Sequence, residues 1–391
     1  MKFYLNIIRI GLIVLGLFLI NPLQHYSYDF HKAGVFYTEN DSTFSMSVIF
    51  AGDAMVHSAQ YNSAYNDSLG FYNFNPVFQY VKSILAESDL KIINLETTLG
   101  GKPYSGYPNF SSPDTFAYAL KEAGFNYFAL ANNHTADKGK DGIIRTLDVL
   151  KSYNISSTGT FKDSLDRAVR YPVIFEFNTI KTALLNYTYS TNGISVPEPV
   201  IVNRIDSSLI RNDIKEARRR GAEVVMVYFH WGNEYERQPS TYQKNIAEFT
   251  FKSGADIIIG SHPHVVQPIE LYKYREDSII HKRWVVWSLG NFVSNQRDKY
   301  SDGGIMVKFK IRKNIFNNKI NISDMTYIPY WVYKQSNPTK YFILPVSMID
   351  RDDCSLPVMS LYDFNAFKLF AEETKQHIKN DSLQLYEWKK N

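Results

Sequence analysis

GSHPHVVQ (Gly260–Gln267) follows the apolar run ADIII (Ala255–Ile259) and sets two histidines at the end of a predicted strand. Pro263 excludes a helix interior at this point. In an extended chain, residues two apart point to the same side, so we expect His262 and His264 to converge. Two imidazoles on one face suit zinc, iron or manganese. The run therefore predicts a strand that delivers metal ligands to a sheet edge.

The same arrangement, an apolar run followed by metal-ligand side chains, recurs four times. The runs are FAGDAMVH (Phe50–His57), INLETT (Ile93–Thr98), ALANNHTAD (Ala129–Asp137) and VVMVYFHWGNEY (Val224–Tyr235). They add the candidate ligands and catalytic groups Asp53, His57, Glu96, Asn133, His134 and His230. Strand ends of an α/β sheet meet at one edge, and the ligands of one metal must lie within a few ångströms. The sequence therefore predicts a single metal centre.

Each candidate also has an ordinary structural explanation. Asp53 could cap a turn, His230 could be a satisfied core histidine, and Asn133 could belong to a turn with its neighbour Asn132. Recurrence at strand end after strand end favours the metal centre. SLGNF (Ser288–Phe292) could line the site with backbone amides or form a turn, and the sequence does not choose between them.

The residue types suggest distinct roles. Gly52 allows a sharp turn that leaves the Asp53 carboxylate at a strand end. The carboxylate of Glu96 could bridge two cations. Asn133 offers a carbonyl oxygen, and His134 beside it could donate a proton or act as an outer hydrogen-bonding group.

Apolar strand-like runs alternate with amphipathic helical stretches, which predicts an α/β fold of two sheets flanked by helices. Helices are expected near residues 76–87, 114–123, 140–152, 205–220, 242–252 and 365–378. A hairpin is expected to turn at Asn178 and Thr179. Beyond Gln267 the runs PIELYKY, RWVVWSLGNF, GGIMVKFKI and DMTYIPYWVY predict a second sheet packed against the first.

Composition limits the function classes. The 391 residues are 45% apolar with a net charge of +4, enough for a large core and without a block of like charge, so nucleic acid is not an expected partner. The single cysteine, Cys354, excludes an intrachain disulfide and a cysteine-based zinc site.

The N-terminus reads MKFYLNIIRIGLIVLGLFLINP, with Lys2 and Arg9 before an apolar run. We expect residues 1–22 to be an uncleaved signal anchor, a single-pass membrane segment with the rest of the chain extracytoplasmic; the alternative is a cleaved signal and a secreted or periplasmic protein. Residues 23–44 are predicted to be a tether, residues 45–333 one domain, and residues 334–391 a C-terminal extension.

The runs GDAMVH, NLETTL, ANNHTADKGKDGI, HWGNEY, GSHPHVVQ and SLGNFV occur in the order found in the bacterial capsule-synthesis protein CapA family of poly-gamma-glutamate biosynthesis, which the chain resembles. That family is similar to calcineurin-like metallophosphoesterases. The resemblance implies a dinuclear centre of divalent ions, with Mn, Fe or Zn as the candidates. It places one metal on Asp53, His57, Glu96 and His264, the other on Glu96, Asn133, His230 and His262, and makes His134, beside Asn133, the proton donor.

The sequence leaves two alternative functions open. One is a metal-dependent hydrolase of a phosphorus or carbonyl centre, phosphoesterase-like, acting in capsule or exopolymer biosynthesis. The other is a non-catalytic, metal-binding assembly or export component that binds an anionic polymer such as poly-gamma-glutamate. In both cases the expected partners are the anionic exopolymer or its precursor, other capsule-synthesis membrane proteins, and the membrane through the N-terminus.

Overall fold

The computed structural model describes residues 43–276, 278–349, 356–379 and 385–388. Within these ranges no helix is both long and apolar enough to cross a membrane. The predicted anchor at residues 1–22, the tether up to residue 42 and Cys354 lie outside the described residues.

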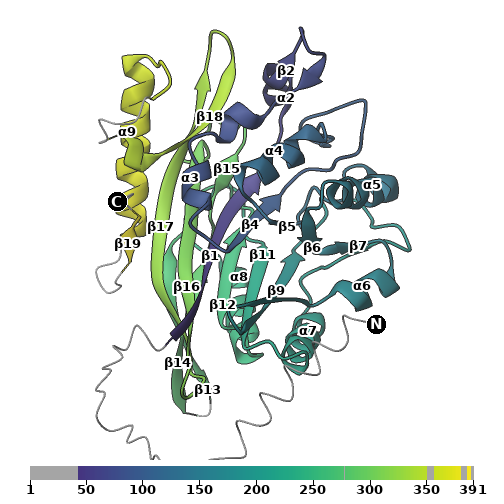
Figure 1. The fold of residues 1–391 in the computed structure, drawn as a ribbon, viewed down its shortest axis with the longest axis vertical. Helices are drawn as coiled ribbons and strands as arrows, with labels where there is room; N and C mark the ends of the chain where they lie inside the picture. The colour runs from purple at the N-terminus through teal and green to yellow at the C-terminus, as the bar shows by residue number, and fades with distance from the viewer. Residues whose placement is uncertain (1–42, 277, 350–355, 380–384, 389–391) are drawn as a thin grey trace, which may run out of the picture. The chain divides into compact units, whose positions relative to one another are not determined.

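Nine strands form the first sheet, which contains β1 at its centre (Figure 1). Its order is β18 (Lys340–Pro345), β17 (Ile320–Gln335), β16 (Gly303–Asn314), β1 (Thr43–Ala54), β4 (Leu90–Leu95), β5 (Tyr127–Ala129) and β6 (Ser156–Thr158), with β15 (Asn291–Val293) on β1 and β19 (Tyr386–Glu387) on β17. The pairs β1–β4, β4–β5 and β5–β6 are parallel, whereas β16 runs antiparallel to β1.

The second sheet has six strands. Its order is β13 (Ile269–Glu276), β14 (Ile279–Val286), β12 (Ile257–Ser261), β11 (Val224–His230), β9 (Ile180–Thr188) and β8 (Val173–Phe177). The strands β9, β11 and β12 are parallel neighbours. The predicted β8–β9 hairpin is confirmed: Asn178 and Thr179 form its two-residue turn, with φ of 48° and 64°. Two positive φ angles are typical of the type I′ turn that suits hairpin twist.

The strands beyond Gln267 do not form a sheet of their own, so that part of the prediction is wrong. β13 and β14 extend the second sheet, while β16, β17 and β18 extend the first. Periodicity shows that a segment is a strand but carries no information about its partner. Here β1 is the partner of β16, with Phe50 opposite Val307 on one side and opposite Ile92 of β4 on the other.

The two sheets face each other across a buried apolar layer, which confirms the predicted two-sheet α/β sandwich. Phe50, Ile92 and Val307 from the first sheet share this layer with Met226 and Ile259 from the second. Full burial of each such side chain contributes about 1.5–3 kcal/mol. The strand ends of both sheets are thereby held in one rigid frame.

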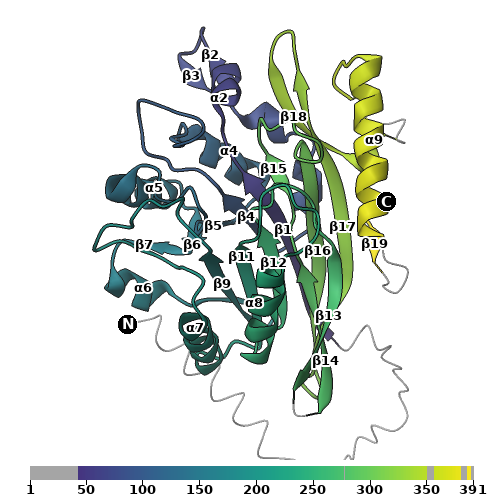
Figure 2. The same ribbon diagram turned by 180° about the vertical axis from the view of Figure 1, so that it is seen from behind.

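Helices cover the outer faces of the sandwich (Figures 1 and 2). On the first sheet lie α4 (Thr115–Ala123) and α5 (Gly139–Ser152), and on the second lie α7 (Ser207–Arg219) and α8 (Thr241–Lys252). The helix expected near 76–87 is instead two short pieces, η2 (Asn75–Phe78) and α3 (Lys82–Leu85). Smaller elements are α2 (Ser58–Ala64), β2 (Tyr65–Asn66), β3 (Phe71–Tyr72), β7 (Thr160–Phe161), α6 (Ser164–Arg170), β10 (Ile201–Val202) and η3 (Val346–Met348).

The C-terminal helix α9 (Leu361–Ile378) lies along β17 in both ribbon views. Ser360 caps it by accepting the backbone N–H of Asp363. The Phe367 ring stacks on Trp331 of β17 with centroids 5.5 Å apart. The helix predicted near residues 365–378 is confirmed. It packs on strands β17 and β18 of the first sheet.

Candidate metal centre

The candidate site lies where β1 and β4 of the first sheet and β11 and β12 of the second end side by side. Asp53 is the next-to-last residue of β1, Glu96 follows β4, His230 ends β11, and His262 follows β12. All four side chains are buried. The carboxyl ends of parallel strands are the usual location of α/β sites, because chains leave the sheet there in divergent directions.

Gly52 is required for Asp53 to reach this position. A Cβ at residue 52 would lie 1.9 Å from the backbone oxygen of Gly290, which also accepts the Asp53 N–H at 3.1 Å. The SLGNF segment is thus pressed against β1, and it supplies a polar side chain: Asn291 Oδ1 lies 3.1 Å from His264 Nδ1. Sequence reasoning anticipated backbone amides or a turn here and missed Asn291.

The Asp53 carboxylate contacts three neighbouring groups of the site through buried polar atoms. It accepts from Asn94 Nδ2 at 2.8 Å and from the His262 N–H at 3.2 Å, and His264 Nδ1 lies 3.2 Å away. Burial alone would raise the pKa of Asp53, but the contact with His264 and the charge of His230 bring it below its ordinary value. Burial works against protonation of His264, yet the carboxylates of Glu96 and Asp53 raise its pKa to about 9.

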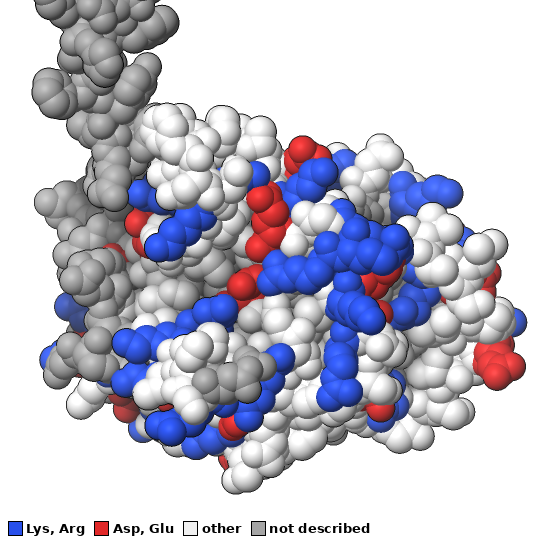
Figure 3. Space-filling view, turned by 90° about the horizontal axis from the view of Figure 1, so that it is seen from below, with Lys and Arg blue, Asp and Glu red and all other residues white. Residues whose placement is uncertain are grey.

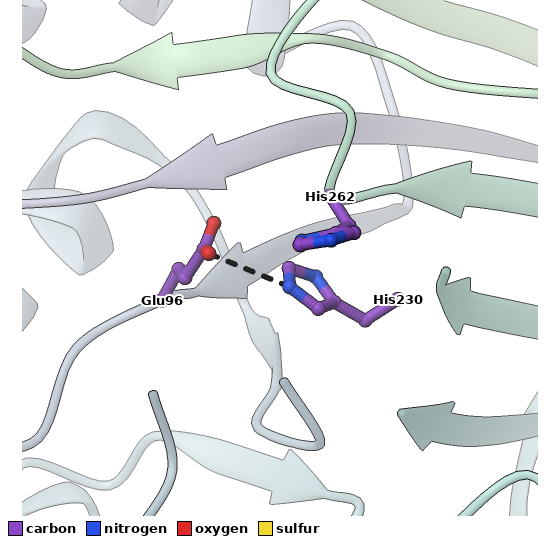
Figure 4. A group of neighbouring side chains, drawn as sticks. All are labelled: Glu96, His230 and His262. Carbon is purple, nitrogen blue, oxygen red and sulfur yellow. Dashed lines mark ion pairs between the residues drawn. The ribbon is translucent and has the colours of Figure 1, made fainter. Parts of the chain in front are cut away.

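Glu96 is fully buried and has no hydrogen-bond partner among the described residues. Neither of its carboxylate oxygens accepts a hydrogen bond from any group in the described part of the chain. Its Oε1 lies 3.4 Å from His230 Nε2 (Figure 4) and 4.0 Å from His264 Nε2. Burial, reinforced by the charge of Asp53, raises the pKa of Glu96 well above 4.5. A buried carboxylate of this kind is costly unless a cation lies beside it.

Two imidazoles complete this side of the site. His230 Nε2 is 2.8 Å from Asn133 Oδ1, and burial lowers the pKa of His230 to about 3. His262 Nδ1 is buried and, among the residues described, has no hydrogen-bond partner. Burial also lowers the pKa of His262 well below 6.5. Both rings are therefore neutral near pH 7, which is the form that binds metals.

The backbone around His262 and His264 differs from the extended chain that the sequence suggested. Their φ angles are 98° and 59°, in the left-handed region that non-glycine residues rarely adopt. The two rings do converge, with centroids 5.7 Å apart, but a strained turn around Pro263 brings them together rather than strand alternation. Such strain persists where the surrounding structure over-determines it and clusters at functional sites.

The donor atoms fit a metal centre. Within the described ranges, three groups have ligand atoms all within 4.8 Å of one another: Glu96, His230 and His262; Asp53, Glu96 and His264; and Glu234, His262 and His264. Imidazole and carboxylate donors suit zinc, iron or manganese. A cation would also compensate the unpartnered atoms of Glu96 and His262. Asn133 is outside these groups but contacts one of their members, His230. Glu234 lies in the run Val224–Tyr235, but the sequence did not predict it as a ligand.

His57 is not in any of these groups of described residues. It lies at the N-cap of α2 (Ser58–Ala64), where its Nδ1 accepts the Asn295 N–H at 3.3 Å and faces Gln60 Oε1 at 3.2 Å. Its ring meets Phe110 edge to face at 5.2 Å. Burial lowers the pKa of His57 to about 4. Its observed contacts are those of a side chain that supports the loops around the site.

His134 forms a buried pair with Asp137. The His134 Nδ1 and Asp137 Oδ2 atoms are 2.8 Å apart, and the same carboxylate oxygen accepts the Phe110 N–H at 2.7 Å. The edge of the Phe110 ring packs on His134 with centroids 4.6 Å apart. The sequence analysis did not predict a role for Asp137, although its position three residues after His134 could have indicated this pair. A carboxylate on Nδ1 fixes the tautomer and orientation of an imidazole.

These features define a two-sheet α/β protein with a buried histidine and carboxylate centre at its strand ends. Residues 47–296 match the family described as bacterial capsule synthesis protein PGA_cap. The chain belongs to this family, and the match includes every candidate residue of the centre.

Curated relatives agree with the family. The chain is 29% identical over 254 residues to the capsule biosynthesis protein CapA of Bacillus anthracis, covering 62% of this chain and 59% of that protein. It is 29% identical over 299 residues to the PGA biosynthesis protein CapA of Bacillus subtilis (strain 168), covering 73% of each. The chain thus spans about three-fifths of the length of the first relative.

Solved structures show weaker likeness. NAD nucleotidase (NadN) of Haemophilus influenzae has a TM-score of 0.49 at 14% identity, covering 86% of this chain and 61% of that chain. The calcineurin-like phosphoesterase YfkN of Bacillus subtilis has a TM-score of 0.45 at 14% identity, covering 86% of this chain and 100% of that chain. Both TM-scores are below 0.5.

Proposed function

We propose that this protein is a metal-dependent hydrolase of capsule or exopolymer biosynthesis, anchored to the cell membrane by residues 1–22 with its domain outside the cytoplasm. The observation that carries the proposal is the buried carboxylate of Glu96. Among the described residues its two oxygens have no hydrogen-bond partner, and neither has Nδ1 of the buried His262. A buried carboxylate that accepts no hydrogen bond, beside the neutral rings of His230 and His262, is stabilised by a cation far better than by any rearrangement of the apolar core.

Two divalent ions would fit the donors. Asp53, Glu96 and His264 would hold one, and Glu96, His230 and His262 the other, with the carbonyl oxygen of Asn133 beside the second. When bound, such ions act as Lewis acids on a phosphorus or carbonyl centre and offset developing negative charge.

The chain's own contribution is a positioned proton donor. Asp137 holds His134 Nδ1, which leaves Nε2 of the same ring free to give a proton to a leaving group. Phe110 packs on this imidazole and restricts its rotation. Aromatic side chains also border the metal residues: Tyr189 lies 4.5 Å from His262 between ring centroids, and Tyr235 lies 6.2 Å from His264. These rings limit how water and substrate approach.

The test uses the full-length chain, purified in detergent without chelators, with metal content measured by mass spectrometry. Hydrolysis of bis(p-nitrophenyl) phosphate is assayed on the same samples. We expect bound divalent metal and metal-dependent turnover in the wild type, and neither after the combined change His262→Ala and His264→Ala. In His134→Ala we expect retained metal and lost turnover, because His134 is outside the donor groups. Absence of metal from the wild type would refute the proposal.

A second candidate function is supported by the opposite end of the sandwich, where β1 begins. Figure 3 shows Lys and Arg side chains gathered on this face. In the strands and the helix end near the start of β1, eight Lys and Arg side chains form salt bridges with five carboxylates: Lys181 with Glu176, Arg218 and Arg283 with Asp256, Arg219 and Arg220 with Glu216, Lys310 and Arg312 with Asp324, and Lys313 with Glu223. The excess positive charge suits an anionic polymer, as expected of an assembly component.

Binding of fluorescent poly-gamma-glutamate, measured against salt concentration, tests this second function. Charge reversal at the exposed Lys282 and at Arg312 should weaken salt-sensitive binding several-fold. Unchanged binding would exclude this face as the polymer site. Polymer binding by a wild type that holds metal but shows no turnover would favour the assembly role over the hydrolase.

A further inference from the structure

The third donor group contains a residue that neither the sequence reasoning nor the family resemblance assigns to the metal centre. Glu234 lies four residues after His230, and its carboxylate is within 4.8 Å of ligand nitrogens of His262 and His264. Glu234 is exposed, unlike the buried ligands Asp53 and Glu96. It therefore lies on the solvent side of the two histidines.

The turn that carries Glu234 is built to hold it there. Gly232 has φ of 96°, and a Cβ at this position would lie 2.7 Å from Oε1 of the buried Gln243, so the chain turns sharply after β11. Tyr235 then donates its N–H to the backbone oxygen of Pro263 at 2.8 Å. Because Pro263 separates the two histidines, this bond ties the Glu234 backbone to the loop that bears them.

The Glu234 carboxylate is free to bind a cation. In the part of the chain that the structure describes, it has no hydrogen bond and no salt bridge, while the nearby Asn233 amide is taken up by Glu236. The metal–ligand distance for imidazole and carboxylate is about 2.0–2.2 Å, so two ligands of one ion lie at most about 4.4 Å apart. An exposed side chain closes the remaining few tenths of an ångström by rotation. His262, whose Nδ1 is buried and has no hydrogen-bond partner among the described residues, belongs to the same group.

We propose that Glu234 is a ligand of a divalent ion held at His262 and His264, and that it takes the place that the family resemblance gives to His57. His57 Nδ1 is occupied by the Asn295 N–H, and its ring is packed on Phe110. Three carboxylates, Asp53, Glu96 and Glu234, against two divalent ions leave the centre with net positive charge. The loaded site then suits an anionic group of the substrate, which deepens the hydrolase proposal and rests on it.

The test compares metal binding by the full-length wild type with Glu234→Gln, with His57→Gln and with Glu236→Gln as the matched control. Glu236 is also exposed, lies two residues further along the chain and is outside all donor groups of the described residues. Affinities for Mn²⁺ and Zn²⁺ are measured by competition with a chromophoric chelator. The visible absorption of the Co²⁺-loaded protein reports the ligand set directly.

We expect Glu234→Gln to weaken at least one binding step by about 10-fold or more and to change the Co²⁺ spectrum, because a ligand is lost. His57→Gln and Glu236→Gln should keep wild-type affinity and spectrum. Wild-type affinity and spectrum in Glu234→Gln would overturn this inference alone, leaving the hydrolase proposal in place. Loss in His57→Gln but not in Glu234→Gln would restore the family's assignment. A wild type that binds neither metal would overturn both proposals.

Discussion

Glu96→Gln should stabilise the metal-free protein while abolishing its stabilisation by metal. The substitution keeps the size of the side chain and removes the buried charge. Because the folded-state pKa of Glu96 is raised well above 4.5, the folded state binds a proton that the unfolded state releases. The contribution of Glu96 to the free energy of unfolding is therefore fully present below pH 4.5 and falls as pH rises toward its folded-state pKa.

The magnitude follows from linkage. The wild type should lose about 1.4 kcal/mol of unfolding free energy relative to Glu96→Gln for each pH unit above 4.5, until the folded-state pKa is reached. In this range Glu96 of the folded wild type is protonated and therefore neutral, as the glutamine of the variant is, so the buried histidines with lowered pKa titrate alike in the two proteins and cancel in the difference. His264, with its pKa raised to about 9, adds to the pH dependence of stability only above pH 6.5, where the stabilisation from its charge begins to be lost. The range from pH 5 to 6 thus isolates Glu96.

The assay is denaturant unfolding in EDTA, followed by the fluorescence of the buried Trp231 and Trp287, at pH 5, 5.5 and 6. A parallel series with Mn²⁺ at 100 times its dissociation constant should add about 2.7 kcal/mol to the wild type and little to Glu96→Gln. A wild-type-minus-variant difference that does not change between pH 5 and 6 would refute the reasoning, because it would mean that Glu96 is already compensated within the chain.

Three other predictions follow from the same contacts. In metal-free Glu96→Gln, where the opposing titration of Glu96 is removed, the free energy of unfolding should fall as pH falls below 6.5, by up to about 1.4 kcal/mol per pH unit for each of His230 and His262, because their folded-state pKa values are lowered and the unfolded state takes up the protons; acid unfolding in EDTA measures it. Asp137→Asn should lower kcat by about 10²-fold with KM unchanged, because His134 loses the group that fixes its tautomer; steady-state kinetics check this. Gly52→Ala should destabilise the fold by about 3 kcal/mol or more, seen by thermal unfolding, because its Cβ meets a backbone oxygen.

Gly70→Ala is the control for Gly52→Ala. Gly70→Ala, where a Cβ would meet nothing within 4 Å, should cost only the strain of its left-handed backbone. Equal costs at the two glycines would contradict the steric account of β1. Unchanged kcat in Asp137→Asn would remove the His134 pair from catalysis. Stability of metal-free Glu96→Gln that is independent of pH below 6.5 would show that His230 and His262 are not buried as neutral rings.

The sequence by itself determined the elements and most of the centre. An apolar run followed by a ligand at Asp53, Glu96 or His230 is local information, and so is the turn at Asn178 and Thr179. Strand ends carry functional groups in α/β proteins because the chain leaves the sheet there, so reading ligands after strands located these three side chains correctly at one edge.

Only the tertiary structure decided which strands pair and which side chains meet. The pattern of β16 is the same whether it borders β1 or belongs to a separate sheet, because alternation records burial and not the identity of the neighbour. Local spacing placed His57 near Asp53 but could not show that its Nδ1 accepts the Asn295 N–H, or that a turn tied to Pro263 brings Glu234 near His262 and His264. Those outcomes depend on contacts between segments distant in sequence, and such contacts exist only once the two sheets have packed.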